Sequence, residues 1–293
     1  MRLLILLLLF LTGCGLTGNK FPHYDIPTNP QIIKSNVVLH NEFESQPFVW
    51  NGQLKYILNW RFSAGAGNNA PGASIRIYDF NTKALEHEFG QNLILSTILV
   101  DNGTAYVYSV NKWASANTSI VLSTSTDLVN WTNQTVYSGD KIFNTSVSKT
   151  PTGYVMAYET FNGNNLSTQF LVSTDLINWT HAGSILEDNQ DASCPTIRFI
   201  NGKYYVWYLV RYNFQPYYIT KIARSSDLVT WEISPKVFLA PTISELTNNS
   251  DMDLVEFNGQ VYIFYNSGDQ NSQFWITYAT YSGTLQNLVD YYF

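Results

Sequence analysis

Four carboxylates in the chain stand where they could act together: Glu44, Asp191, Asp251 and Asp253. Glu44 and Asp251 each lie eight residues before the glycine of a predicted hairpin turn, in the first and last of five repeated segments. Asp253 follows two residues later and would share a strand face with Asp251. Carboxylates gathered at one concave site can work as a pair, in which one donates a proton and the other attacks or activates water. Alternatively, Asp251 caps a loop and Glu44 only pairs with Arg61.

The elements that would position these residues repeat along the chain. Each repeat has a short apolar strand, a tight turn with glycine and an aromatic-rich strand. The turns are expected at residues 51–52, 102–103, 152–153, 201–202 and 258–259. A period near fifty residues, with several strands per repeat, is typical of β-propeller blades. The sequence therefore predicts an all-β, five-bladed β-propeller over residues 36–293, with a short C-terminal helix within 284–292.

Equivalent positions at the start of the first strand of each repeat can be found by counting back from the turn glycine. Eight residues before the turn glycines lie Glu44, Leu95, Thr145, Cys194 and Asp251. Asp191 is three residues upstream of this position in the fourth repeat. Because equivalent strand positions of a propeller meet around its axis, these residues are expected at one end of a central channel.

A second motif, S-[ST]-D-L-[VI]-[NT]-W, occurs at residues 125–131, 173–179 and 225–231. A short acidic side chain can accept hydrogen bonds from backbone amides just downstream, while the leucine and tryptophan pack beneath the turn. We therefore interpret Asp127, Asp175 and Asp227 as turn residues and not as catalytic groups.

Closure of the ring requires an outer strand for the last blade, because the chain after residue 281 is predicted to be helical. Residues 36–40 have strand character and precede the first repeat. We expect them to pair near residues 274–278 and so to remove exposed sheet edges.

The N-terminal fourteen residues are predicted to be a targeting segment. Arg2 supplies a positive end, residues 3–11 are apolar, and the tetrapeptide at residues 11–14 resembles the lipobox of bacterial lipoproteins, with Cys14 as the lipidated residue. Residues 15–35 would then form a tether, and the protein would be an extracytoplasmic, lipid-anchored protein of the cell envelope. The alternative is an ordinary secretory leader and a secreted protein.

Composition and charge limit the kinds of partner that the protein is expected to bind. The formal net charge is −6 and no cluster of lysine and arginine is present, which argues against nucleic acid. The four histidines lack ligand spacing, so no metal site and no cofactor are expected. If Cys14 carries lipid, Cys194 is the only other cysteine and no disulfide can form.

The repeat length, the turns and the second motif together resemble the five-bladed glycoside hydrolases, with families 43 and 32 nearest. The resemblance implies sugar binding at the mouth of the central channel. In family 43 it also implies an aspartate base, an aspartate that tunes pKa values and a glutamate acid. These would fall at Gln46, near Asn144 and near Ser193 of this chain, and none of the three is a carboxylate. The standard triad is therefore not expected.

Other residues on the first and second strands of the repeats suit sugar binding, because aromatic faces stack on sugar rings and arginine can bind a carboxylate or sulfate through two hydrogen bonds. The expected substrate-binding residues are Trp60, Arg61, Tyr158, Glu159, Arg198 and Arg211. Two functions follow as hypotheses, both with an oligo- or polysaccharide as partner. One is a glycoside hydrolase with Glu44, Asp251, Asp253 and Asp191 as catalytic candidates, and the other is a non-catalytic glycan-binding lipoprotein.

Overall fold

The computed structural model describes residues 26–42, 44–61, 72–112, 117–161, 163, 165–186, 191–211, 217–269 and 272–293. The targeting segment, Cys14 and most of the expected tether lie outside these residues. Strands make up most of the described chain, and its α-helix, α2 (Leu285–Asp290), is short and C-terminal as predicted. None of the described helices has the length and apolar character needed to cross a membrane.

Three sheets have four antiparallel strands each, in sequence order. Their strands are β2 (Ser45–Trp50), β3 (Gln53–Trp60), β4 (Ser74–Asp79) and β5 (Leu85–Phe89); β6 (Ile94–Asp101), β7 (Thr104–Val110), β8 (Thr118–Ser125) and β9 (Thr132–Gly139); and β10 (Ile142–Thr150), β11 (Gly153–Phe161), β12 (Leu166–Ser173) and β13 (Thr180–Leu186).

A fourth sheet has eight strands. It contains β14 (Ser193–Ile200), β15 (Lys203–Arg211), β16 (Tyr218–Ser225), β17 (Glu232–Ile233), β18 (Asn248–Phe257), β19 (Gln260–Gly268), β20 (Phe274–Ser282) and β1 (Ile32–Lys34). The pairings within β14–β17 and within β18–β20 with β1 are antiparallel. These two groups are joined by a parallel pairing of Tyr218 with Asn248.

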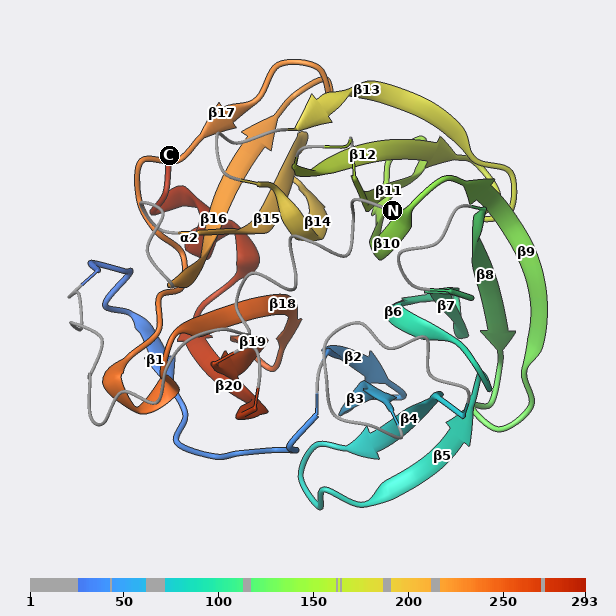
Figure 1. The fold of residues 1–293 in the computed structure, drawn as a ribbon, viewed down its shortest axis with the longest axis horizontal. Helices are drawn as coiled ribbons and strands as arrows, with labels where there is room; N and C mark the ends of the chain where they lie inside the picture. The colour runs from blue at the N-terminus through green and yellow to red at the C-terminus, as the bar shows by residue number, and fades with distance from the viewer. Residues whose placement is uncertain are drawn as a thin grey trace.

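The sheets surround a common centre, with β2, β6, β10, β14 and β18 nearest to it (Figure 1). Apolar side chains fill the space between neighbouring sheets. One such cluster joins Tyr108 of β7 to Met156 of β11 and Leu171 of β12, all fully or almost fully buried. The core is therefore spread around the ring, and the centre is left to the first strands of the sheets.

The five hairpin turns between first and second strands are present, and four of them have the predicted residues. Asn51 and Gly52 have φ values of 49° and 74°, which is the backbone of a type I′ turn, and the other three Asn-Gly pairs are alike. The third turn was predicted one residue too late. Thr150 pairs with Gly153, so the turn residues are Pro151 and Thr152.

The three aspartates of the second motif fix turns, as expected. Oδ1 of Asp175 accepts hydrogen bonds from the backbone N–H groups of Ile177 (2.9 Å) and Asn178 (2.7 Å), and Leu176 is buried beneath them. Asp127 and Asp227 make the same contacts in their own turns. These hydrogen bonds lower the pKa of each carboxyl, since they favour its ionised form.

The N-terminal segment pairs with the last strand, but the regular pairing lies earlier in the chain than predicted. Strand β1, residues 32–34, is antiparallel to residues 279–281 of β20, whereas residues 36–40 contribute an isolated bridge between His40 and Ile276. Residues 32–34, which the sequence analysis assigned to the expected tether, thus belong to the sheet. The ammonium of Lys34, whose side chain is 20% exposed, donates hydrogen bonds to Glu245 (2.6 Å) and Asn249 (2.6 Å) and so ties β1 to the sheet.

Candidate functional site

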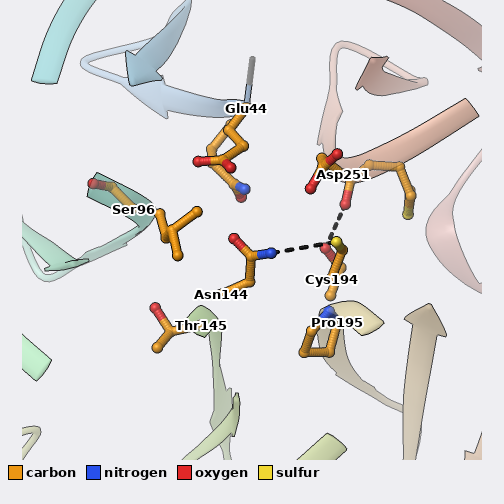
Figure 2. Close-up of a pocket in the computed structure, with 11 residues that line it drawn as sticks. Glu44, Ser96, Asn144, Thr145, Cys194, Pro195 and Asp251 are labelled. Carbon is orange, nitrogen blue, oxygen red and sulfur yellow. Dashed lines mark hydrogen bonds between the residues drawn. The ribbon is translucent and has the colours of Figure 1, made fainter. Parts of the chain in front are cut away.

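A small pocket lies where the strands nearest the centre begin. Five of its lining residues come from five different first strands or the residues directly before them: Glu44, Leu95, Asn144, Cys194 and Asp251. The space among the lining atoms, with the open solvent at its mouth included, is about 270 Å³. Glu44, Asn144, Cys194 and Asp251 face one another across it (Figure 2). The expectation that Glu44 and Asp251 share one site is correct.

These five residues are equivalent by register. Each lies eight residues before the second residue of its hairpin turn. In the third repeat this residue is Asn144 and not Thr145, because the third turn is formed by Pro151 and Thr152. The sequence repeat thus specifies the ring of the pocket once the turn is placed correctly.

A local irregularity turns these side chains toward the centre. The ladder is interrupted after Ile94, Ser193 and Ser250, which is the pattern of a β-bulge. The next residues, Leu95, Cys194 and Asp251, have φ values of 55°, 48° and 48°, and Glu44 has 60°. Such values are uncommon outside glycine. The bulge re-aims Leu95, Cys194 and Asp251 out of the normal strand alternation and into the pocket, whereas Glu44 lies directly before β2, whose pairing with β3 is regular.

Glu44 is buried, with an exposed fraction of 8%, and is paired with Arg61. Nη2 of Arg61 donates to Oε1 of Glu44 at 2.7 Å, whereas Oε2 is buried without a hydrogen-bond partner. Burial raises the pKa of the Glu44 carboxyl to about 7; Arg61 opposes this change and the charge of Asp251 adds to it. A carboxyl with this pKa can hold a proton near neutral pH.

Asp251 lies opposite Glu44 and is held by two neighbours. The hydroxyl of Ser250 donates to Oδ2 of Asp251 at 2.5 Å, and the thiol of Cys194 is hydrogen-bonded to the carboxylate (Figure 2). Nδ2 of Asn144 lies 3.3 Å from Sγ of Cys194. Burial raises the pKa of this thiol well above its usual range, and the charges of Asp251, Glu159 and Glu44 raise it further. The thiol therefore keeps its proton.

Glu159 of β11 lies directly behind the pocket, which it does not line. Its Oε2 accepts hydrogen bonds from the backbone N–H of Cys194 (2.6 Å) and from Nδ2 of Asn144 (3.3 Å). Burial raises the pKa of this carboxyl to about 7. Glu159 was predicted to contact substrate, and the structure places it behind the ring residues Asn144 and Cys194 and not among the residues that line the open space.

The other two catalytic candidates do not line the pocket. The alternation argument failed for Asp253 because the bulge at Asp251 and Met252 breaks it, and the buried Asp253 carboxylate instead pairs with Arg198. Asp191 accepts a hydrogen bond from the backbone N–H of Leu166 at 2.8 Å.

None of the six expected substrate-binding residues lines this pocket. Arg61 and Arg198 are held in ion pairs with Glu44 and Asp253. The hydroxyl of the buried Tyr158 donates to Gln169 of the neighbouring strand.

The remaining two residues stand at the ends of second strands. Trp60 ends β3, where the guanidinium carbon of Arg76 lies 4.1 Å from its ring centroid. Arg211 ends β15 and lies over the ring of Tyr218. The register prediction placed Cys194 in this ring but put Thr145 where Asn144 lies, and it missed that Asn144 and Cys194 connect the carboxylates. Among the described residues no group of histidine, cysteine, aspartate and glutamate has the arrangement of a metal site.

No protein-family model and no curated protein matches the sequence. Solved structures do match the fold. A thermostable family-43 glycoside hydrolase superposes with a TM-score of 0.65 and 13% identity, over 86% of this chain and 91% of its own. The chain has the fold of the family-43 glycoside hydrolases. The native arabinanase of Bacillus subtilis gives a TM-score of 0.60 with 13% identity, over 84% of this chain and 95% of its own.

An α-L-arabinofuranosidase of Clostridium thermocellum gives a TM-score of 0.57 with 18% identity, over 76% of this chain and 81% of its own. The three solved structures named here, which share the fold of this chain, are thus glycoside hydrolases. At the positions expected for the family-43 carboxylates this chain has Gln46, Asn144 and Ser193. Gln46 and Asn144 line the pocket, where Glu44 and Asp251 supply its carboxylates.

Proposed function

We propose that the protein is a carbohydrate-active glycoside hydrolase whose pocket lies at the mouth of the central channel of a five-bladed β-propeller. Five blades follow if the eight-stranded sheet is counted as two four-stranded units, β14–β17 and β18–β20 with β1. The parallel pairing that joins these units involves a single residue on each side, which supports the division. The pocket then takes one ring position from every blade.

The observation that carries the hydrolase function is the pairing of two unlike carboxyl groups in one pocket. Oε2 of Glu44 is buried without a partner, and Glu44 has a pKa of about 7. Asp251, on the facing strand, accepts hydrogen bonds from Ser250 and Cys194. Glycoside hydrolysis needs one carboxyl that donates a proton to the leaving oxygen and one carboxylate that attacks or activates water. We assign the first role to Glu44 and the second to Asp251.

The charged groups around the pocket also limit the class of substrate. The expected arginine clamps are not available for an acidic sugar, because Arg61 and Arg198 are committed to Glu44 and Asp253. We therefore propose an uncharged glycosyl group in the pocket.

Attachment to the cell envelope completes the proposal. The lipobox-like tetrapeptide ending at Cys14 supports an extracytoplasmic lipoprotein that acts on extracellular glycans, with a membrane contact through its N-terminal lipid.

A glycan-binding protein without turnover is the second candidate. It is favoured by one observation, namely that Gln46, Asn144 and Ser193 stand at the positions where the family resemblance expects carboxylates. The same pocket would then bind a terminal sugar without cleaving its linkage.

The two functions are separated by a screen for release of reducing ends from plant, algal and host glycans. The hydrolase function predicts release from at least one glycan, with loss of turnover in Asp251→Asn and none in Glu232→Gln, a carboxylate on the outer strand β17. Binding without release from any glycan would reject the hydrolase and favour the second candidate.

A further inference from the structure

A buried carboxylate, Glu159, stands behind the pocket. Glu159 has an exposed fraction of 4%, and in the described part of the chain no ion pair to it is found. Burial of an unpaired carboxylate is unfavourable, because the charge leaves water without an opposite charge beside it. Packing alone does not require such a group, because a glutamine has the same shape and can accept the same hydrogen bonds.

The contacts of Glu159 all lead to the pocket. The same oxygen, Oε2, receives the backbone N–H of Cys194 and the side-chain amide of Asn144, which are neighbours in the ring. It thus satisfies the N–H of a residue at a positive φ, 48°, and helps to fix the orientation of the Cys194 side chain. In turn, the thiol contacts the carboxylate of Asp251 (Figure 2).

Cys194 consequently lies between two carboxylates, one in the pocket and one buried behind it. Its thiol is hydrogen-bonded to Asp251 on the pocket side and is also within hydrogen-bond reach of Glu159 on the buried side. A thiol has one proton and can donate it to only one of them at a time. The titratable groups that face the thiol are Asp251 of β18, Glu159 of β11 and Glu44 directly before β2.

We propose that Glu159 is a positioning residue for Asp251 that acts through the thiol and backbone of Cys194. The family resemblance expects a carboxylate near Asn144 of β10. In this chain Glu159 of β11, the next strand of the same sheet, supplies a carboxylate behind that position. The thiol passes the charge state of Glu159 to the pocket, because it turns its proton toward whichever carboxylate is ionised. Only the effect on turnover rests on the proposed hydrolase function.

The coupling is tested without any substrate by NMR of protein labelled with ¹³C in its cysteines. The Cβ shift reports the hydrogen bonding of the thiol, and the chain has only one other cysteine, Cys14, so Cys194→Ser assigns the signals. Burial raises the pKa of Glu159 to about 7, so in wild type we expect the Cys194 Cβ shift to change with pH in that region as the thiol turns toward the newly ionised carboxylate. Glu159→Gln should remove this change. Asp191→Asn, which removes a charge three residues upstream that does not contact the thiol, should leave it in place.

Turnover provides the second measurement. Cys194→Ala and Glu159→Gln should both move the pH profile of kcat/KM, and Cys194→Ser, which retains a donor between the two carboxylates, should move it less than Cys194→Ala. A pH dependence of the Cys194 Cβ shift that is the same in Glu159→Gln and wild type would overturn the proposal. If the wild-type protein cleaves no glycan, the hydrolase function fails, and the NMR measurement still decides whether Glu159 is coupled to the pocket.

Discussion

Replacement of Glu159 by glutamine should change how the stability of the protein depends on pH. Burial raises the pKa of this carboxyl from an ordinary 4.5 to about 7. In the unfolded chain the group loses its proton near pH 4.5, so between pH 4.5 and 7 unfolding releases a proton. The folded state therefore loses stability as the pH rises through this window and remains less stable above it.

The size of this loss follows from the pKa difference. At about 1.4 kcal/mol for each pH unit, the change from 4.5 to about 7 corresponds to about 3 kcal/mol. Glutamine does not titrate and can accept the hydrogen bond from Cys194. For a domain of this size, 3 kcal/mol corresponds to roughly 6 to 12 °C in Tm. The Tm of Glu159→Gln relative to wild type should therefore rise by this amount between pH 4.5 and pH 8.

Thermal unfolding followed by circular dichroism at five pH values measures this difference. Glu44 has a raised pKa in both proteins, so its contribution cancels in the comparison. Glu232→Gln, at a carboxylate with a side chain 61% exposed, is the control and should track wild type. A Tm difference between Glu159→Gln and wild type that stays constant within 2 °C over the whole range would refute the assignment of a buried, raised carboxyl.

Three other predictions concern the N-terminal segment. A chain that starts at Glu42 lacks β1, and its Tm should fall in a single transition, because the loss exposes the edge of β20; an unchanged Tm would reject closure by this segment. Lys34→Met should cost about 3 kcal/mol in denaturant unfolding because Glu245 is left buried without its cation, and adding Glu245→Gln should recover part of this; equal stability of single and double variants would contradict the ion-pair argument. Cys14→Ser should move the protein from the membrane to the soluble fraction of a bacterial host, and continued fractionation with membranes would reject lipid attachment at this residue.

The sequence predicted the sheets well because the turn residues and motifs that specify them lie close together in the chain. Turn residues such as Asn51 and Gly52 have backbone preferences of their own, and the motif around Asp175 is closed by contacts within six residues. The third turn lacks the Asn-Gly pair, and this one difference moved the ring position from Asn144 to Thr145.

The pocket was predicted only in part because its parts depend on distant contacts. Register brought Glu44 and Asp251 together correctly. Strand alternation then misplaced Asp253, since a bulge has no signature in composition. The sequence analysis assigned Glu159 to substrate binding, because only the packing of β11 behind β14 shows that it faces Cys194.

The central claim is that Glu44 donates a proton to a departing sugar oxygen, and its most direct test compares two leaving groups. Aryl glycosides of the sugar identified in the screen would be made with a poor leaving group, which needs protonation, and with dinitrophenol, which does not. For Glu44→Gln we predict a loss of about 10² to 10⁴-fold in kcat/KM on the first and a rate within a few-fold of wild type on the second. An equal loss on both substrates would contradict the role of Glu44 as the proton donor.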